Sequence, residues 1–496
     1  MNFINKSINF KQIALFILLG LTVVGIEIFF GAITVLSNST LPIFLLAGVL
    51  VFLVFLVKPL WGYLIALFFL SFVGDTFSFD LVGGVTMRPR DIIFPIVILG
   101  WLLFYTFKED ENRLPVEKTE INNVLFVLGW YIFLTILWAS SKDSSVSKSI
   151  QYVFDLCLFF LTISIVTKRE DLHKVCQAWC VGGIFISFVC LFQLFFTGQR
   201  SAGFTESSLG LGEFLGYPLI FAIYLFLVTQ NRKIRFGYFV VISTIFSGML
   251  STQARGPLLG LGAGVAFILL VLSKDNKTMQ TIMKYTLFVV VIGVLGLLGL
   301  EAIGVNVGSE LLTKLFQRFT DILVEEVTTE AGSVEWRLNL WRAAWGMTFD
   351  NPMLGVGIGN FGPLSQAYGL SDPSDCAHNI YFHLLAELGI IGFSIVCYFI
   401  YKLFSTCRNI HAHLILASDK LFMICLMGSL IAKGVRDLTF GFFVEDRALF
   451  LLIALAFVQA RISFAEKQTS WPENYPPGFA GSGAIPQIKT SRPKTP

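Results

Sequence analysis

Long runs of apolar residues, separated by short polar segments, dominate this chain. A run of roughly 17 to 25 apolar residues is long enough to cross a bilayer as a helix. Uninterrupted Leu, Ile, Phe and Val runs without period-two alternation favour helices over a β-barrel. The pattern therefore predicts an all-α polytopic membrane protein with about 12–14 transmembrane helices. Fourteen runs are centred near residues 24, 49, 66, 99, 130, 158, 185, 220, 244, 265, 294, 391, 428 and 455, the third, ninth and fourteenth being weak.

Composition agrees with this prediction. Hydrophobic residues make up 55% of the 496 positions and charged residues 14%, with a mean hydropathy of +0.75. The first apolar run, from Ile13 to Leu36, is too long for a signal peptide, so we expect it to remain as an anchor. A net charge of +3, spread over short loops, does not indicate a nucleic-acid partner. Most of the eight cysteines lie in apolar runs and imply no disulfide framework.

The distribution of Lys and Arg predicts the orientation of the helices. With the N-terminus in the cytoplasm, the loops on that side carry about twice as many Lys and Arg as the opposite loops, as the positive-inside rule requires. We therefore divide the chain into transmembrane helices over residues 1–305, an extracytoplasmic loop over 306–377, transmembrane helices over 378–463 and a disordered cytoplasmic tail over 464–496, which is rich in proline.

The extracytoplasmic loop contains an amphipathic helix. Ser333 can cap a helix that runs to about Phe349, where Asp-Asn-Pro stops it. Arg337, Trp341 and Trp345 lie at i, i+4 and i+8 on one face, a pattern that is also typical of a helix lying flat on a bilayer. The Gly-rich stretch "GVGIGNFG" that follows predicts a loop or tight turn, and it lacks the strand context of a dinucleotide fold.

A polar stripe enters the next apolar run in the segment "CAHNIYFHLLAELG". Asn379, His383 and Glu387 lie at i, i+4 and i+8, on one face of a helix. His383 and Glu387 have the spacing of a metal pair, but no third ligand is evident. Packing with an interhelical hydrogen bond is therefore the favoured interpretation. The chain has no Asp-x-Asp motif and no Walker loop, so we expect no metal and no nucleotide cofactor.

Unusual polar residues converge on the extracytoplasmic face. An arginine beside glycine at the end of a spanning helix offers a fixed fork of donors next to free backbone N–H groups, which suits a phosphate or diphosphate carried on a lipid. The alternative for each arginine is a side chain that snorkels from a helix end, and for the histidine a solvated loop residue. The candidates are Arg88, Arg90, Arg200, Arg255, Arg337, His378 and Asn379.

Other features leave two further classes of function open. Acidic residues in or near spans are costly enough to be functional candidates, and Glu27, Asp155, Glu213 and Glu301 are such residues. They favour a transporter or flippase of an anionic or lipid-linked solute, although they are scattered without a proton relay. A structural scaffold that recruits partners through its tail is a weaker alternative.

Several motifs together resemble a known family. The segments "RLNLWRAAWGMTFDNPMLGVGIGNFG" and "CAHNIYFHLLAELGIIG" resemble the signature region of the bacterial O-antigen ligase and O-antigen polymerase superfamily, which are Wzy-type, GT-C-like membrane glycosyltransferases. Upstream, "STQARGPLLGLGAG" and "GFTESSLGLGEFLGYPLIFAI" are similar to two further elements of the family. The resemblance covers Gln199 to Gly392. The chain departs from the family in "TQAR", where Ser or Gly often precedes the arginine, and in fourteen runs where twelve are commoner.

The resemblance implies a metal-independent enzyme of the bacterial cytoplasmic (inner) membrane, whose active site faces the periplasm or cell exterior. The implied donor is an undecaprenyl-diphosphate-linked glycan. The implied acceptor is lipid A core, for a ligase, or another lipid-linked repeat, for a polymerase. By resemblance, Arg200 and Arg255 hold the diphosphate, and Arg337 touches donor phosphate or sugar. His378 is then the general base for the acceptor hydroxyl or stabilises the leaving diphosphate. Asn379, Arg88 and Arg90 remain candidate substrate contacts.

Overall fold

The computed structural model describes residues 41–69, 79–81, 85–87, 89–107, 120–197, 201, 203, 208–273, 334–370, 376–439 and 446–469. Two of the fourteen expected spans, those near residues 24 and 294, lie outside this part. Every other expected span falls on a helix. These helices are α2 (Leu41–Val57), α3 (Pro59–Phe69), α4 (Pro89–Phe107), α5 (Glu120–Thr135), α6 (Lys142–Ile165), α7 (Arg169–Thr197), α8 (Ser208–Val228), α9 (Arg232–Ser251), α10 (Arg255–Ser273), α15 (Ile380–His413), α16 (Ala417–Arg436) and α17 (Arg447–Thr469).

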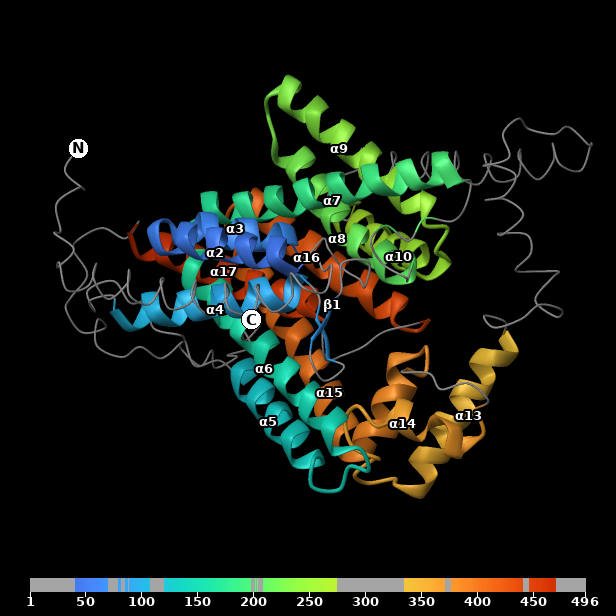
Figure 1. The fold of residues 1–496 in the computed structure, drawn as a ribbon. Coiled ribbons are helices and arrows are strands. Elements are labelled where there is room, and N and C mark those ends of the chain that lie inside the picture. The colour runs from blue at the N-terminus through green and yellow to red at the C-terminus, as the bar shows by residue number, and fades with distance from the viewer. Residues whose placement is uncertain are drawn as a thin grey trace, which may run out of the picture.

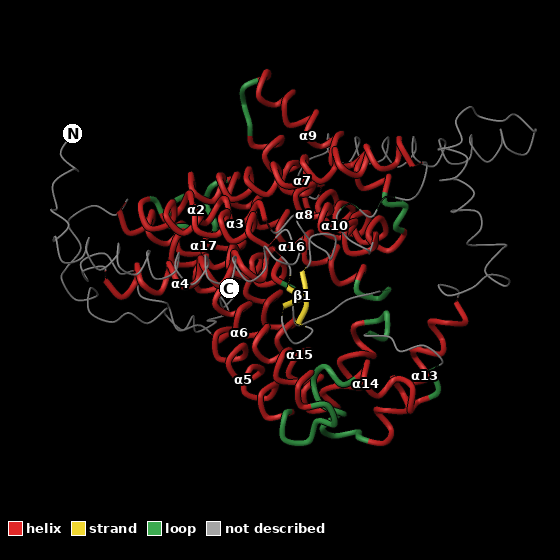
Figure 2. The backbone as a smooth tube through the Cα atoms, viewed as in Figure 1, coloured by secondary structure: helices red, strands yellow, loops and turns green. Residues whose placement is uncertain are grey.

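The helices form the bundle drawn in Figure 1, and helix dominates the described chain in Figure 2. Six helices, α6 to α10 and α15, are long and apolar enough to cross a membrane, so the prediction of an all-α, multi-pass membrane protein is confirmed. The total of fourteen stays a prediction, since α3 has 11 residues and spans only about 16 Å. A short hairpin of β1 (Phe79–Leu81) and β2 (Val85–Met87) was not expected. Helix α17 continues six residues past the predicted tail boundary at 463.

Small residues bring α10 and α16 into close contact. A Cβ atom at Gly264 would lie 2.5 Å from the carbonyl oxygen of Gly428, and a Cβ atom at Gly260 would meet the carbonyl oxygen of Ala432. Gly260 and Gly264, four residues apart, therefore face Gly428 and Ala432, also four apart. This small-xxx-small arrangement lets two backbones approach closely inside a membrane. It places the first residues of α10 beside the last residues of α16.

The loops between the helices lie at two ends of the bundle. Contacts within each end agree with the expectation that successive loops alternate between the two sides of the membrane. At the His378 end, the backbone N–H of Ile380 donates to the carbonyl oxygen of Asp437 at 3.0 Å. At the Asp419 end, the guanidinium of Arg169 pairs with Asp419 at 2.7 Å. Each contact joins two loops that were expected on the same side of the membrane. Which end faces the cytoplasm stays a prediction.

Helix α15 cannot be one straight rod. It has 34 residues and α16 has 20, which correspond to about 51 and 30 Å of helix. Both ends of α15 nevertheless meet α16, at the Ile380–Asp437 hydrogen bond and through the short connection between the two helices. The excess length is absorbed at Gly389, which has φ 62° and ψ −173°. The label α15 thus covers two helical pieces, 380–388 and 390–413.

The expected amphipathic helix is present as α13 (Val334–Asp350), and this prediction is confirmed. Its apolar stripe is buried against the first piece of α15, α14 (Phe361–Ser365) and the 3₁₀ turn η2 (Gln366–Tyr368). We call residues 334–370 the loop unit. In Figure 1 it lies beside α15. The buried stripe follows the helical repeat and consists of Leu340, Ala343, Ala344 and Met347.

The Gly-rich stretch is a docked loop. The backbone N–H groups of Val356 and Gly357 donate to the carbonyl oxygens of Ala386 and Glu387 at 3.0 and 2.9 Å, just before the break in α15. Just after the break, Ile390 and Ile391 donate to Pro352 and Met353 at 2.9 and 3.2 Å. The loop therefore satisfies the backbone groups that a helix break exposes.

Candidate functional site

Three chain segments meet around Thr439 at the His378 end. The imidazole of His378 hydrogen-bonds the backbone of Thr439. A Cβ atom placed on Gly256, the second residue of α10, would meet the hydroxyl of the same threonine. Thr439 itself closes the last turn of α16, since its N–H donates to the carbonyl oxygen of Arg436 at 2.9 Å. The structure therefore brings Arg255, at the start of α10, to the same end of the bundle as His378.

Asn379 fixes the start of α15. Its side-chain oxygen accepts hydrogen bonds from the backbone N–H groups of Tyr381 and Phe382 at 3.0 and 3.3 Å, as an N-cap residue does. Its amide nitrogen donates to the carbonyl oxygen of Leu438 at 3.3 Å. Asn379, the residue next to His378, thus ties the start of α15 to the end of α16. Its role as a substrate contact stays a prediction.

His378 lies in a strained and positively charged setting. Its φ of 47° is in the left-handed region, which non-glycine residues rarely adopt. Its ring meets that of Trp336 edge to face, with 4.7 Å between centroids. The pKa of His378 is lowered to about 4, chiefly by burial and also by the positive charges of Arg337 and Arg436 and by the neighbouring His383. The imidazole is therefore neutral at pH 7 and can accept a proton.

The cations at the His378 end of the bundle come from separate elements. Arg337 belongs to α13 and Arg436 is the last residue of α16. Arg255 is half-buried and begins α10, where the helix dipole adds a partial positive charge. A helix N-terminus and the guanidinium groups of Arg255 and Arg337 at one end of the bundle favour an anion at this place.

Three of the expected arginines are not placed here. Arg88 and Arg200 lie outside the described residues, and only the backbone of Arg90 is described, in α4. The residue after Arg200 is described: the N–H of Ser201 donates to the carbonyl oxygen of Ser251 at 3.1 Å. That bond fixes residue 201 beside the end of α9. The roles expected for these three arginines stay predictions.

The interpretation of the polar stripe as packing is confirmed. The carboxylate of Glu387 accepts a hydrogen bond from the backbone N–H of Phe361 at 3.0 Å and lies 3.4 Å from the imidazole of His383. Both side chains are buried, and they hold the Gly-rich loop on α15. No group of three metal-ligating side chains occurs in the described segments.

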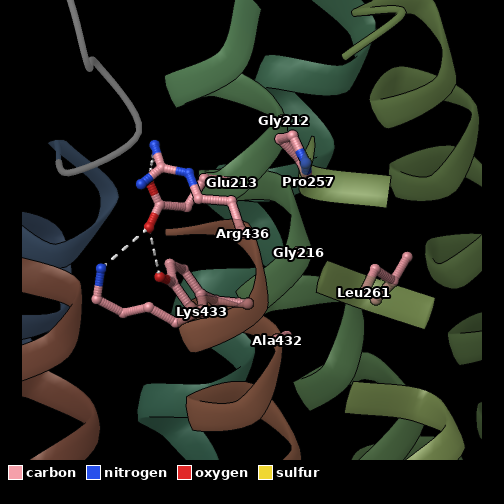
Figure 3. Close-up of a pocket in the computed structure, with 9 residues that line it drawn as sticks. Gly212, Glu213, Gly216, Pro257, Leu261, Ala432, Lys433 and Arg436 are labelled. Carbon is pink, nitrogen blue, oxygen red and sulfur yellow. Dashed lines mark hydrogen bonds and ion pairs between the residues drawn. The ribbon is translucent and has the colours of Figure 1, made fainter. Parts of the chain in front are cut away.

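Sequence reasoning missed a charged network at the same end. Glu213, on α8, was considered as a transport acid, whereas Figure 3 shows it together with the side chains of Lys433 and Arg436 along one small cavity. Asp437 and Asp446 pair with the same cations. The available signal was "KGVRD" at the end of an apolar run, because so many charges at a span end need partners. Asp155 is buried on α6, and Glu27 and Glu301 lie outside the described residues.

Comparisons with known proteins find a family model and a distant relative that match parts of this chain. Residues 240–397 match the model of a family described as O-antigen ligase. The match begins within α9 and ends within α15, so it includes Arg255, the loop unit and His378. The teichuronic acid biosynthesis protein TuaE of Bacillus subtilis (strain 168) is 22% identical over 346 residues, which cover 63% of this chain and 67% of that protein.

Proposed function

Because the chain belongs to the O-antigen ligase and O-antigen polymerase superfamily, we propose that it is a glycosyltransferase that transfers a lipid-linked glycan to an acceptor during polysaccharide biosynthesis. The proposed donor is an undecaprenyl-diphosphate-linked glycan, bound at the His378 end in contact with membrane lipids. The acceptor is lipid A core or the end of another lipid-linked glycan. A relative that serves teichuronic acid biosynthesis supports the assembly of a glycan polymer.

One observation carries this proposal. Arg255 and His378 are 123 positions apart in the sequence, and both belong to the stretch that matches the family. In the folded chain, α10 begins beside Thr439, and His378 bonds to the same residue. A cation for a phosphate and a base for a hydroxyl therefore occupy one end of the bundle.

The arrangement supports a direct displacement. The oxygen of the acceptor hydroxyl forms a bond to C1 of the donor sugar, and the bond from C1 to the diphosphate oxygen breaks. The leaving diphosphate keeps the bonding electrons, and Arg255 and Arg337 stabilise its growing negative charge. The proton of the hydroxyl passes to the neutral imidazole of His378. A bound diphosphate would also offset the arginine charges that now disfavour a protonated His378, so donor binding would make this base stronger.

The test is the glycan profile of a null strain that carries the wild-type protein, His378→Ala or Arg255→Ala at matched membrane levels. We expect each substitution to reduce transfer at least a hundredfold, the usual range for a lost base or charge stabiliser. Shortened surface chains would identify a polymerase, and full chains left on the lipid carrier would identify a ligase. His378→Gln is the control for polarity. It keeps a polar side chain at this position, but that side chain cannot accept a proton at neutral pH.

The same experiment separates this proposal from transport. A transporter that uses membrane acids should tolerate His378→Ala but lose activity in Asp155→Asn, since Asp155 is buried in α6. If both site variants gave the wild-type profile, the proposed chemistry would be wrong.

A further inference from the structure

Five largely buried charged side chains form one network at the His378 end, and Figure 3 shows three of them, Glu213, Lys433 and Arg436. The ammonium of Lys433 lies 2.9 Å from Asp437 and 3.5 Å from Glu213, and it also pairs with Asp446. The guanidinium of Arg436 lies 2.9 Å from Asp437 and pairs with Glu213 through its other terminal nitrogen. Only 6% of Lys433 and 3% of Arg436 is exposed. The network thus joins α8, the end of α16 and the residue before α17.

Stability alone is a weak reason for such a network. Removing charges from water is costly, and buried ion pairs can often be replaced by apolar side chains without loss of stability. Helices α8 and α16 also pack through apolar side chains, for example Tyr224 against Phe422, with 5.3 Å between ring centroids. An arrangement that is expensive and not needed to join the helices is a candidate for fixing the orientation of particular groups.

The orientation that it fixes belongs to the start of α15. The carbonyl oxygen of Gly434, beside Lys433, accepts a hydrogen bond from the hydroxyl of Tyr381 at 3.1 Å. The carbonyl oxygens of Asp437 and Leu438 accept from Ile380 and from the side chain of Asn379. All three donors follow directly after His378 in the sequence. Any movement of the end of α16 is therefore transmitted to the backbone that carries His378.

Charge connects the network to His378 as well. The charged or titratable groups that face His378 are Arg337 on α13, Arg436 on α16 and His383 on α15. Of the two arginines, Arg436 is the one that two carboxylates hold. The positive potential that His378 experiences from α16 therefore depends on how far Glu213 and its partners neutralise Arg436.

We propose that Glu213 is a positioning residue, which holds Arg436 by a buried ion pair and thereby sets both the charge and the backbone position at His378. Its consequence for catalysis rests on the proposed function. Its electrostatic consequence does not, because it can be measured without any reaction.

The measurement is an NMR titration of histidine ring signals in the full-length protein. The chain has five histidines, so His378→Asn assigns the signal of His378. Glu213→Gln removes a negative charge and leaves Arg436 less neutralised, so the pKa of His378 should fall. Arg436→Gln removes a positive charge, so the pKa should rise by roughly one unit, as expected for one neighbouring charge. Opposite signs are the diagnostic result.

Arg169→Gln is the matched control. It also removes a cation that pairs with a carboxylate of α16, since Arg169 of α7 forms a partly buried ion pair with Asp419. Asp419 precedes Arg436 by 17 residues, which is about 25 Å of helix. The pKa of His378 should not change. Equal titration of His378 in the wild type and in folded Arg436→Gln would overturn the proposal. If Glu213→Gln fails to fold, Arg436→Gln and Glu213→Asp, which keeps the charge, still decide it.

Transfer activity then separates the two proposals. Glu213→Gln should lower transfer about tenfold or more, and Glu213→Asp should restore part of it, because the shorter carboxylate keeps the pair with Arg436. A shifted titration together with wild-type transfer in His378→Ala would contradict the proposed function and leave the positioning role intact. An unshifted titration together with lost transfer in His378→Ala would contradict the positioning role and leave the proposed function intact.

Discussion

Gly389 should be the least replaceable glycine in α15, and Gly389→Ala tests this. Its φ of 62° and ψ of −173° belong to a region that is essentially restricted to glycine, where another residue costs about 1–3 kcal/mol. A Cβ atom there would also lie 2.5 Å from the backbone nitrogen of Gly355 and from the carbonyl group of Met353. These are backbone atoms, so the loop must move away to relieve the overlap.

The size of the effect follows from the contacts that would be lost. Four backbone hydrogen bonds join the loop to α15 on either side of the break, and each contributes about 1 kcal/mol net. Loss of two of them together with the backbone strain gives a destabilisation of roughly 3–5 kcal/mol for docking of the loop unit. Since 1.4 kcal/mol corresponds to a factor of ten, protected amides should exchange about a hundred to several thousand times faster.

Hydrogen exchange of the protein in detergent or nanodiscs provides the assay. The informative amides are those of Val356 and Gly357, which donate across the break. Gly237→Ala is the control, because a Cβ atom there meets nothing within 4 Å, and alanine should be neutral or slightly stabilising inside a helix. Gly355→Ala should resemble Gly389→Ala, and the double variant should be less than additive. Wild-type exchange in Gly389→Ala would refute the reasoning.

Two further predictions concern the site and its support. Because the folded pKa of His378 is lowered to about 4, kcat/KM should stay constant from about pH 7 down to about 5 and fall only as the pH approaches 4, instead of falling near 6.5. Arg337→Gln should move this acid limb to higher pH, because one of the charges that oppose protonation is gone, and a limb that stays near 6.5 in the wild type would contradict the geometry. Asn360 is fully buried, accepts from the N–H of Ser141 at 2.6 Å and links the Gly-rich loop to α6. Asn360→Ala should cost about 1–2 kcal/mol by leaving the partly buried N–H of Ser141 without its acceptor. This should be seen as a lower midpoint of thermal unfolding than in the exposed control Gln366→Ala; equal midpoints would count against this role.

The positions of the helices were predictable because apolar length is a local property. All twelve expected spans in the described segments are helical, and α13 begins and ends within one residue of its expected bounds. The break at Gly389 was not predictable. "LAELGIIG" reads as one continuous helix whose polar residue, Glu387, lies on the polar stripe, and glycine is common within membrane helices. Only the docking of the Gly-rich loop shows that the first piece of the helix ends here, and the docking residue Gly357 precedes Gly389 by 32 positions.

The candidate site was predictable in part for a similar reason. Arg255 and His378 stand in motifs that can be read along the chain. Arg436 does not, because a cation at the end of a span is normally a loop charge, and its pairing with Glu213 joins residues 223 positions apart. The face of α13 whose pattern is also typical of a helix lying flat on a bilayer illustrates the same limit: Trp345 contacts Phe382 of α15, with ring centroids 5.5 Å apart.

The double attachment of α15 has a consequence for how this chain can diverge in evolution. The piece from 390 to 413 starts at a break locked to Gly355 and ends at the connection to α16. One inserted residue would lengthen it by about 1.5 Å and turn everything before it by about 100°, so Gly389 would no longer meet its partner. Substitutions on its lipid-facing side leave both attachments unchanged. An alignment of relatives should therefore show frequent replacements here but no gaps.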